Sequence, residues 1–467
     1  MTSVHEGDAA AGQPTSEASE PEEISSGVDT LTRMQLRRER KLARRAKRKE
    51  RKAARSPLNR GIRRALVATV VLGSALVLYS FGSALAKPNN DPVGIKAVSW
   101  FRDNNLGFVV NFAERTFYTW NAPKKGGVPK GGIPTAASEQ PTPSNSAAVT
   151  TTTFPRPKNI ATLASPPLAN EGAWQPAGKL VDGHPVAYVT YMRPDAVHTG
   201  KLVGVAWFNS KNLRAELYNG TEEPGGKNWT NGSRVEPADY GPLVATFNGG
   251  FKLNGSLGGY YSEGRMVRPL VDGRASIIVR SDGSIMVGEW GREAVMGPDI
   301  KSVRQNLSLL VDRGEPAPDL NSNFQSRWGA TLGNSLYVWR SGVGVDRQGG
   351  LIYVGGPAMS VQSLANVFMA AGAYNAMQLD INTDWVSAHT YTGGDNGVPI
   401  DPSKLLSEMT RPANRHLAYG TRDFVALFAK PAPPVPTTTT ATPSTTTTSK
   451  PGSKSTKPAA TTTTMKR

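Results

Sequence analysis

The sequence contains no cysteine. Disulfides, cysteine-ligated zinc or iron–sulfur sites and thiol catalysis are therefore excluded, and an exported domain would depend on core packing alone for its stability. The P-loop, the G-x-S-x-G nucleophile elbow and the H-E-x-x-H zinc motif are also absent. His184, His198 and His416 are isolated and lack metal-ligand spacing, so we expect packing or surface roles for them.

Acidic residues are scarce where basic ones are dense. The net charge is +17, yet the first 32 residues carry no Lys or Arg, whereas residues 33–64 carry sixteen of them against two Glu. Residues 65–86 (ALVATVVLGSALVLYSFGSALA) follow without any charge. At about 1.5 Å per residue this stretch spans the roughly 30 Å hydrocarbon core of a bilayer, which predicts one transmembrane helix. The flanking Arg60, Arg63 and Arg64 predict a cytoplasmic N-terminus and an extracytoplasmic main domain in a single-pass protein of the cell membrane.

Two alternatives to a membrane anchor remain open. A buried core helix would rarely carry an arginine flank, and a signal peptide cut after Ala84-Leu85-Ala86 would have a 64-residue leader, far longer than an ordinary one. The basic residues 33–55 could bind nucleic acid, but beside a membrane helix they more simply contact anionic head groups. We therefore expect membrane lipid as a partner and no nucleic acid.

Composition divides the chain into segments. The stretch after the apolar run mixes aromatics with charges, which is typical of an amphipathic segment at a membrane surface and nearly as typical of a small satellite of the main domain. Segments rich in Pro, Gly, Ser and Thr cannot bury enough apolar surface to fold. The expected order is a disordered segment (1–64), a transmembrane helix (65–86), a juxtamembrane segment (87–120), a linker (121–157), a globular domain (158–430) and a disordered Thr/Pro-rich tail (431–467).

The globular domain shows mainly strand patterns. A Ser360 cap followed by apolar residues at helical spacing predicts one convincing helix that ends before Gly372. We therefore predict an α+β fold with a mixed, mostly antiparallel β-sheet and a few packed helices, plus the N-terminal transmembrane helix. Strands are expected at 186–192, 202–208, 243–247, 351–356 and 375–380, with a hairpin around Asp282-Gly283.

Three clusters in this domain could carry chemistry. Asn248-Gly249-Gly250-Phe251 follows an apolar strand, and its paired glycines let backbone N–H groups approach an anion or a sugar, although this cluster taken alone favours a Gly turn before a hairpin. Arg340 and Ser341 begin a Gly-rich strand, where an arginine suits bidentate phosphate binding or merely an edge-strand surface position.

The third cluster is Asp380-Ile381-Asn382-Thr383-Asp384-Trp385, with His389 close behind. The paired carboxylates could divide into acid and base or nucleophile for glycosyl transfer, and the tryptophan could stack on a sugar ring. The carboxylates could equally hold a divalent cation such as calcium or magnesium, or Asp380 could cap the next turn. No other cofactor is expected.

The order of these clusters resembles the phosphodiester glycosidase family over roughly residues 240–390. In that family N-G-G-F-F precedes a D-G hairpin, R-T-A-I-G, a helix opening G-M-T and finally L-D-G-G-G-S. This chain has Lys252 for the second Phe and Ile381-Asn382-Thr383-Asp384 for the closing G-G-G-S. The corresponding residues are Asn248–Phe251, Asp282-Gly283, Arg340–Gly344, Met359-Ser360 and Leu379-Asp380.

The resemblance implies a hydrolase that acts on a sugar-1-phosphodiester, such as those in cell-wall polymers. Arg340 would hold the phosphate and Asp380 would stabilise charge at the anomeric carbon or activate water, with Asp384 and His389 in reserve for proton transfer. The expected substrate-binding residues are Asn248, Gly249, Gly250, Phe251, Ser341, Asn382 and Trp385. Loss of the family's glycine run supports an alternative, a non-catalytic envelope module that binds glycans or proteins.

Overall fold

The computed structural model describes residues 26–53, 57–88, 91–120, 123–135, 156–322, 325–331 and 335–431. The predicted C-terminal tail beyond residue 431 and residues 136–155 of the predicted linker lie outside these ranges. Contacts divide the chain into two units, one of Met1–Lys87 with Lys96–Trp100 and one of Pro88–Ile95 with Phe101–Arg467.

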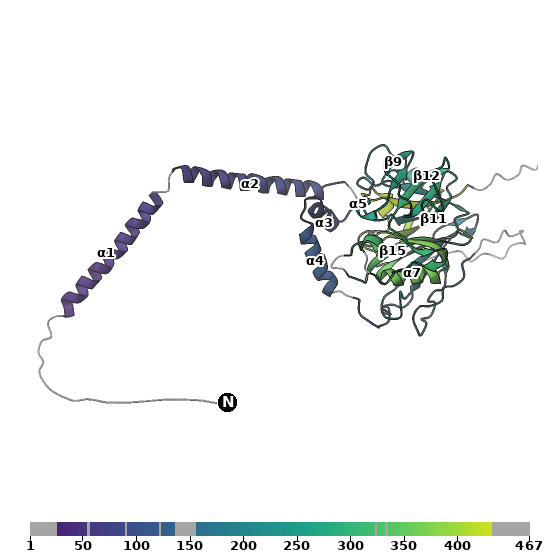
Figure 1. Cartoon of the computed structure of the whole chain (residues 1–467), viewed down its shortest axis with the longest axis horizontal. Helices are drawn as coiled ribbons and strands as arrows, with labels where there is room; N and C mark the ends of the chain where they lie inside the picture. Colours follow the sequence, from purple (N-terminus) through teal and green to yellow (C-terminus); the bar gives the residue numbers. More distant parts are fainter. Residues whose placement is uncertain are drawn as a thin grey trace, which may run out of the picture. The chain divides into compact units, whose positions relative to one another are not determined.

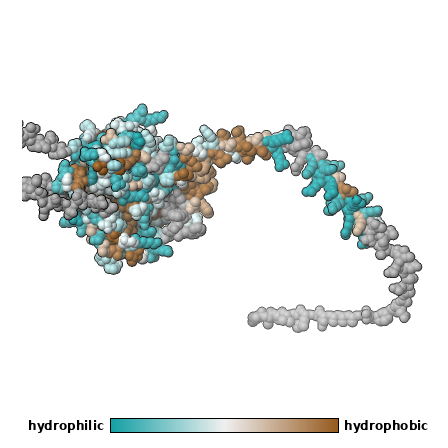
Figure 2. Space-filling view, turned by 180° about the vertical axis from the view of Figure 1, so that it is seen from behind, coloured by the Kyte–Doolittle hydropathy of each residue, from teal (hydrophilic) through white to brown (hydrophobic). Residues whose placement is uncertain are grey.

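The first unit contains two long helices, α1 (Ser26–Ala53) and α2 (Pro57–Leu85) (Figure 1). We expected residues 1–64 to be disordered, whereas residues 26–53 form a helix, because Arg, Lys, Glu, Ala and Leu all favour helical backbone. Within α2, Gly61–Leu85 is the one helix of the described residues that is long and apolar enough to cross a membrane. None of that apolar stretch is buried, and Figure 2 shows hydrophobic side chains along it.

The predicted juxtamembrane segment forms two helices, α3 (Val93–Asp103) and α4 (Gly107–Trp120). Between them Asn105 adopts a φ of 61°, a left-handed conformation that asparagine tolerates better than most residues and that ends a helix. In the described part of the predicted linker, the Gly126 N–H donates to Val197 O at 2.7 Å and Ile133 packs against the core of the domain.

The second unit is built on an eight-stranded sheet. Each pairing of its named strands is antiparallel. The strand order is β1 (Gln175–Pro176), β4 (Ala187–Met192), β5 (Val203–Phe208), β16 (Leu351–Met359), β15 (Val338–Asp346), β17 (Ala373–Gln378), β13 (Leu309–Asp312) and β14 (Glu315–Pro316).

Two five-stranded antiparallel sheets and a two-stranded ribbon complete the domain. One sheet has the order β11 (Ile285–Glu289), β10 (Ala275–Arg280), β12 (Ile300–Gln305), β8 (Tyr260–Ser262) and β9 (Arg265–Arg268). The other has the order β19 (Asp401–Lys404), β18 (Ala388–Thr392), β7 (Leu243–Asn248), β20 (Phe424–Ala429) and β6 (Leu213–Tyr218). The ribbon pairs β2 (Leu180–Val181) with β3 (His184–Pro185).

Hydrophobic side chains pack on both faces of the large sheet. One core cluster combines side chains of all three sheets, such as Val189, Val244 and Ile277. The opposite face is covered by α7 (Val361–Ala370), which buries Leu364 and Phe368 against it. The Ser360 side chain accepts from the Ser363 N–H, and this capping box fixes where the helix begins. The short helices are α5 (Leu253–Ser256), α6 (Gln325–Trp328), η1 (Pro237–Asp239) and η3 (Arg415–Leu417).

The predicted fold class is confirmed for the domain, which is α+β with mostly antiparallel sheets and few helices. The expected strands appear as β4, β5, β7, β16 and β17, the Asp282-Gly283 turn joins β10 to β11, and the helix after Ser360 is α7. Most of these strands are apolar runs that are buried along their whole length, and α7 has apolar residues at helical spacing, which explains why the sequence alone located them.

Candidate active site

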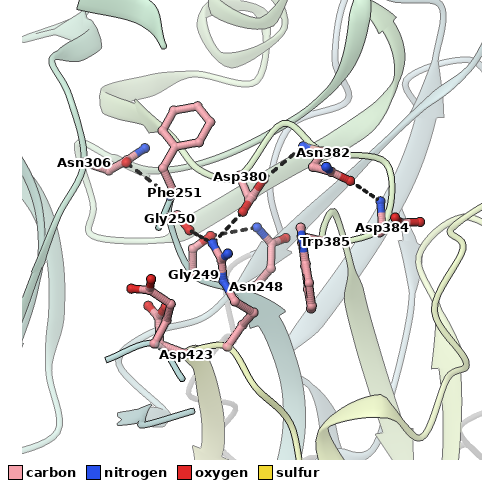
Figure 3. Close-up of polar contacts among 12 residues, drawn as sticks. Asn248, Gly249, Gly250, Phe251, Asn306, Asp380, Asn382, Asp384, Trp385 and Asp423 are labelled. Atoms are coloured by element: carbon pink, nitrogen blue, oxygen red, sulfur yellow. Dashed lines mark hydrogen bonds and ion pairs between the residues drawn. The ribbon is translucent and has the colours of Figure 1, made fainter. Parts of the chain in front are cut away.

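The three sequence clusters meet where β7, β15 and β17 come together. The Asn248 side chain donates to Ser341 Oγ at 3.0 Å, and Ser341 Oγ donates to Asp380 O at 2.7 Å. The Asp380 N–H in turn donates to Gly249 O at 3.3 Å. These four residues are buried, lie up to 132 positions apart in the sequence and are joined by their mutual bonds in one network. Figure 3 shows Asn248, Gly249 and Asp380 of this network.

Asp380 is the buried carboxylate at the centre of this network. Its Oδ2 lies 2.8 Å from Arg422 Nη2, and its Oδ1 accepts the Asn382 N–H at 2.9 Å. Burial raises the pKa of Asp380 above its ordinary value, and the positive charge of Arg422 opposes that rise. Arg422 Nη2 also donates to Gly250 O at 3.1 Å, so one guanidinium ties the carboxylate to the glycine pair.

A second buried ion pair contacts the backbone of the Asn248–Phe251 loop. Arg304 Nε lies 2.8 Å from Asp423 Oδ2, and both side chains are 1% exposed. The Arg304 guanidinium also donates to Phe251 O, and the Gly249 N–H donates to Asp423 O at 3.1 Å. A Cβ on Gly249 would lie 2.1 Å from Asp423 Oδ2, so the glycine is required for this close approach.

Asn306 fixes the other end of that loop. Its Oδ1 accepts the Phe251 N–H at 3.2 Å, and its Nδ2 donates to Gln378 O at 2.7 Å. A Cβ on Gly250 would lie 3.0 Å from the Asn306 amide carbon, so this glycine also packs against a neighbour. The paired glycines therefore meet protein groups on at least one side, in addition to any ligand they could face.

The segment after Asp380 turns sharply back on itself. Asn382 Oδ1 accepts the Asp384 N–H at 2.9 Å, and Asn382 O accepts the Trp385 N–H at 2.8 Å. Three guanidinium groups lie against the Trp385 ring, those of Arg411, Arg415 and Arg422, at 4.4, 5.0 and 5.1 Å from its centroid. Burial raises the pKa of Asp384, and Arg411 opposes this rise.

A cavity of about 290 Å³ opens beside Asp380. Four of the predicted site residues line it, namely Phe251, Asp380, Asn382 and Trp385. Asn248, Gly249, Gly250, Ser341 and Asp384 do not line it but hold those four residues in place or lie directly beside them. Arg102, Lys252 and Arg422 bring positive charge to the cavity wall. The cavity therefore combines a carboxylate, three cations and aromatic surface.

Arg340 and His389 lie away from the cavity wall. The Arg340 guanidinium is 1% exposed and donates to Met359 O at 2.9 Å and to Gln378 Oε1 at 2.7 Å. Burial lowers the pKa of Arg340 to about 10. Among the described residues, neither ring nitrogen of His389 has a hydrogen-bond partner, and burial lowers the pKa of this histidine to about 3. These contacts give Arg340 a structural position between strands and keep His389 uncharged at neutral pH.

Sequence reasoning missed four residues of the network: Arg304, Asn306, Arg422 and Asp423. Each lies next to a strand end, Arg304 and Asn306 at β12 and the other pair just before β20. Polar residues that follow or precede an apolar strand could have marked these positions, but not their partners. Within the described residues, no group of three or more His, Asp or Glu side chains is placed to hold a metal ion.

Comparison with known proteins bears on residues 241–380, which match the family model of the phosphodiester glycosidases. A structural match is the catalytic domain of zebrafish N-acetylglucosamine-1-phosphodiester alpha-N-acetylglucosaminidase, auto-inhibited by its pro-peptide, at 18% identity and a TM-score of 0.37. It covers 55% of this chain and 88% of the zebrafish chain.

Two further structures match at lower identity. A hypothetical protein from Synechocystis is 13% identical, with a TM-score of 0.32, over 58% of this chain and 68% of its own. An exported protein from Burkholderia pseudomallei is 12% identical, with a TM-score of 0.27, over 50% of this chain and 75% of its own. None of the curated proteins compared with the chain matches it. Residues 241–380, which include Asn248–Phe251, Ser341 and Asp380, therefore match a phosphodiester glycosidase family domain.

Proposed function

We propose that the domain hydrolyses a sugar-1-phosphodiester at the cavity beside Asp380. The observation that carries the proposal is the Asp380–Arg422 pair at 2.8 Å, since it places a carboxylate and a cation together on the wall of one cavity. A phosphomonoester is already a good leaving group. The protein therefore needs mainly a cation for the phosphate and a carboxylate near the anomeric carbon.

In the proposed step, water attacks the anomeric carbon while the bond from that carbon to the phosphate oxygen breaks. Asp380 accepts the proton of the attacking water, and the phosphomonoester leaves with the bonding electron pair, its negative charge held by Arg422. Burial raises the pKa of Asp380, and the positive charge of Arg422 opposes that rise and so favours the ionised form that a base requires. Trp385 and Phe251 offer apolar surface on which a sugar ring could stack.

The proposed substrate is a polymer or lipid of the cell envelope, since α2 has the length and composition of a membrane anchor. We further propose that the N-terminus is cytoplasmic, that the domain is extracytoplasmic, and that α1, with its dense Lys and Arg, contacts anionic lipid. Protease treatment of intact cells tests this arrangement. Cleavage of the domain with protection of α1 is expected, and protection of both would contradict it.

The activity test uses the full chain in detergent on a panel of sugar-1-phosphodiesters, with free sugar and phosphomonoester measured as products. Asp380→Asn is expected to lose about 10² to 10⁴ of the rate, as typically follows loss of a general base. Asp401→Asn, an exposed carboxylate on β19, serves as the matched control and should retain full activity. Equal rates for the two variants would refute the role of Asp380.

One observation favours a second function, a non-catalytic module that binds envelope glycans. Ile381 lines the cavity directly after Asp380, where the family pattern has glycine, so a branched side chain occupies space on the wall. If no panel member is hydrolysed, and one of them binds with the same affinity to the wild type and to Asp380→Asn, this second function replaces the first.

A further inference from the structure

A second, smaller cavity lies beside the first. The two share Trp385 and Arg422 in their walls, and the second is otherwise lined by residues of the segment before β20 together with Asp91, Arg415 and His416. Its volume of about 10 Å³ is room for one water at most. The family match ends at residue 380, so the lining of this cavity lies outside it.

Three buried arginines gather around Trp385, and two of them, Arg415 and Arg422, line the second cavity. Arg411, Arg415 and Arg422 surround the Trp385 ring, and none of them is more than 7% exposed. Like charges this close repel each other, and burying a guanidinium without a counterion is costly. The cluster can therefore exist only with anions in or beside it.

Only two of the three arginines pair with a carboxylate of the described residues. Arg422 pairs with Asp380 at 2.8 Å, and Arg411 pairs with Asp91 at 2.7 Å. Arg415 donates only to neutral oxygens, Trp385 O at 3.0 Å and Ser387 Oγ at 2.6 Å. Burial and the charges of Arg411 and Arg422 lower the pKa of Arg415 to about 9.

Two polar atoms of this cluster are buried without a partner among the described residues, Arg411 Nη2 and His416 Nε2. Native proteins rarely leave such groups unpaired, and those that exist frequently mark a ligand or water position. Within the described part of the chain, Arg415 has no carboxylate among its hydrogen-bond acceptors. Arg411, Arg415 and His416 therefore form a site that has hydrogen-bonding capacity left for an anion.

Asp91 is the anion that occupies this site. Its Oδ1 lies 2.7 Å from Arg411 Nη1, and its Oδ2 accepts from Thr421 Oγ1 at 3.3 Å. The residue is not part of any sheet, since it precedes α3 in the segment Pro88–Ile95, which belongs to the same unit as the domain. Asp91 therefore contacts Arg411 and Thr421 from a segment that lies outside the sheets.

We infer that Arg411, Arg415 and Arg422 form a phosphate subsite that adjoins Asp380 and that the Asp91 carboxylate occupies it in competition with phosphate. The inference rests on the proposed function and deepens it, because it assigns the phosphate of the sugar phosphodiester to this cluster. Arg422 belongs to the subsite and also donates to Asp380, so a phosphate held by Arg422 lies next to that carboxylate. Guanidinium groups suit this ligand because they bind phosphate oxygens in bidentate geometry.

The test titrates the full chain in detergent with inorganic phosphate by calorimetry, which needs no turnover. Asp91→Asn removes the competing charge and keeps the side-chain shape, so phosphate is expected to bind at least about tenfold more tightly, a gain of about 1.4 kcal/mol. Asp103→Asn is the matched control, because it also removes an N-terminal acid, one that lies 3.9 Å from Lys252. Arg415→Gln in the Asp91→Asn background should abolish the gain.

Three results would overturn the inference: no tightening in Asp91→Asn, equal tightening in Asp103→Asn, or a gain that survives Arg415→Gln. Asp91→Asn could also destabilise the fold, because it leaves Arg411 without its counterion. In that case Asp91→Asn is refolded in phosphate and, separately, in chloride of equal ionic strength, and the yields of folded protein are compared. Phosphate should give the higher yield, since a bound ligand stabilises the native state. An equal yield in both salts would then refute the subsite. Phosphate binding without hydrolysis refutes only the proposed function, whereas hydrolysis without an Asp91 effect refutes only the subsite.

Discussion

Replacement of Gly249 by alanine should destabilise the domain, because the new methyl group would collide with Asp423. A Cβ at this position would lie 2.1 Å from Asp423 Oδ2, 2.6 Å from Asp423 Cγ and 2.9 Å from Asp423 O. These distances are all shorter than van der Waals contact, and one of the three atoms is backbone. The Asp423 carboxylate must therefore move, and it cannot move without leaving Arg304, which it meets at 2.8 Å.

The magnitude follows from the burial of that pair. Arg304 and Asp423 are each 1% exposed, and separating a buried ion pair typically costs about 3 to 5 kcal/mol because both charges lose their counterion. For a domain of this size, each kcal/mol lowers the melting temperature by about 2 to 4 °C. Gly249→Ala should therefore melt on the order of 10 °C below the wild type.

The assay is thermal unfolding followed by near-ultraviolet circular dichroism, which reports aromatic packing in the domain. Gly255→Ala is the matched control, because this glycine lies in α5 on the cavity wall and a Cβ there would meet nothing within 4 Å. Alanine favours helix, so the control should melt at or slightly above the wild-type temperature.

A double-mutant cycle isolates the cause. In an Asp423→Ala background the carboxylate is gone, so Gly249→Ala should cost clearly less than it does in the wild type. The reasoning fails if Gly249→Ala melts like the wild type, or if its cost is the same in both backgrounds.

Two further predictions concern residues that the sequence placed in the site. Arg340→Met should lower the free energy of unfolding by about 3 kcal/mol, because Met359 O and Gln378 Oε1 lose their donor, and should leave phosphate affinity unchanged in calorimetry. If the variant loses phosphate affinity while its stability is unchanged, Arg340 binds the ligand and the structural role is wrong. His389 has a pKa of about 3 in the fold against about 6.5 unfolded, so stability should fall by about 1.4 kcal/mol per pH unit as the pH drops below 6.5. His389→Leu should make that decline shallower by the same amount in urea unfolding between about pH 5.5 and 4, and an unchanged slope would contradict a neutral buried His389.

The sequence located the strands and α7 because their patterns are local. The Ser360 cap and the apolar spacing after it are contained in one stretch of chain, and so is the turn at Asp282-Gly283. The convergence of Asn248, Ser341 and Asp380 was accessible for another reason, since a family resemblance supplied their order. Their actual hydrogen bonds depend on which strands are neighbours, and no local pattern determines that.

The ion-pair partner of Asp380 could not be predicted from the sequence. Arg422 lies 42 positions later, and it reaches Asp380 only because β20 inserts between β7 and β6. For Arg340, the sequence did not reveal the direction of the side chain. Its position in a Gly-rich strand suits a phosphate ligand, but its side chain points to Met359 O and Gln378 Oε1 between strands. Side-chain direction is set by register and packing, which residue type alone does not reveal.

The central place of β20 also determines when the site can come into being. Ribosomes make the chain from its N-terminus, so Asp380 and Arg304 exist before Arg422 and Asp423, the residues that neutralise them. A chain that stops short of residue 422 contains all of the family-matched residues 241–380, yet β6 and β7 would still lack the strand between them. Synthesis of the segment that contains Arg422, Asp423 and β20 is thus the event that completes the site, and a copy without that segment cannot carry out the proposed reaction.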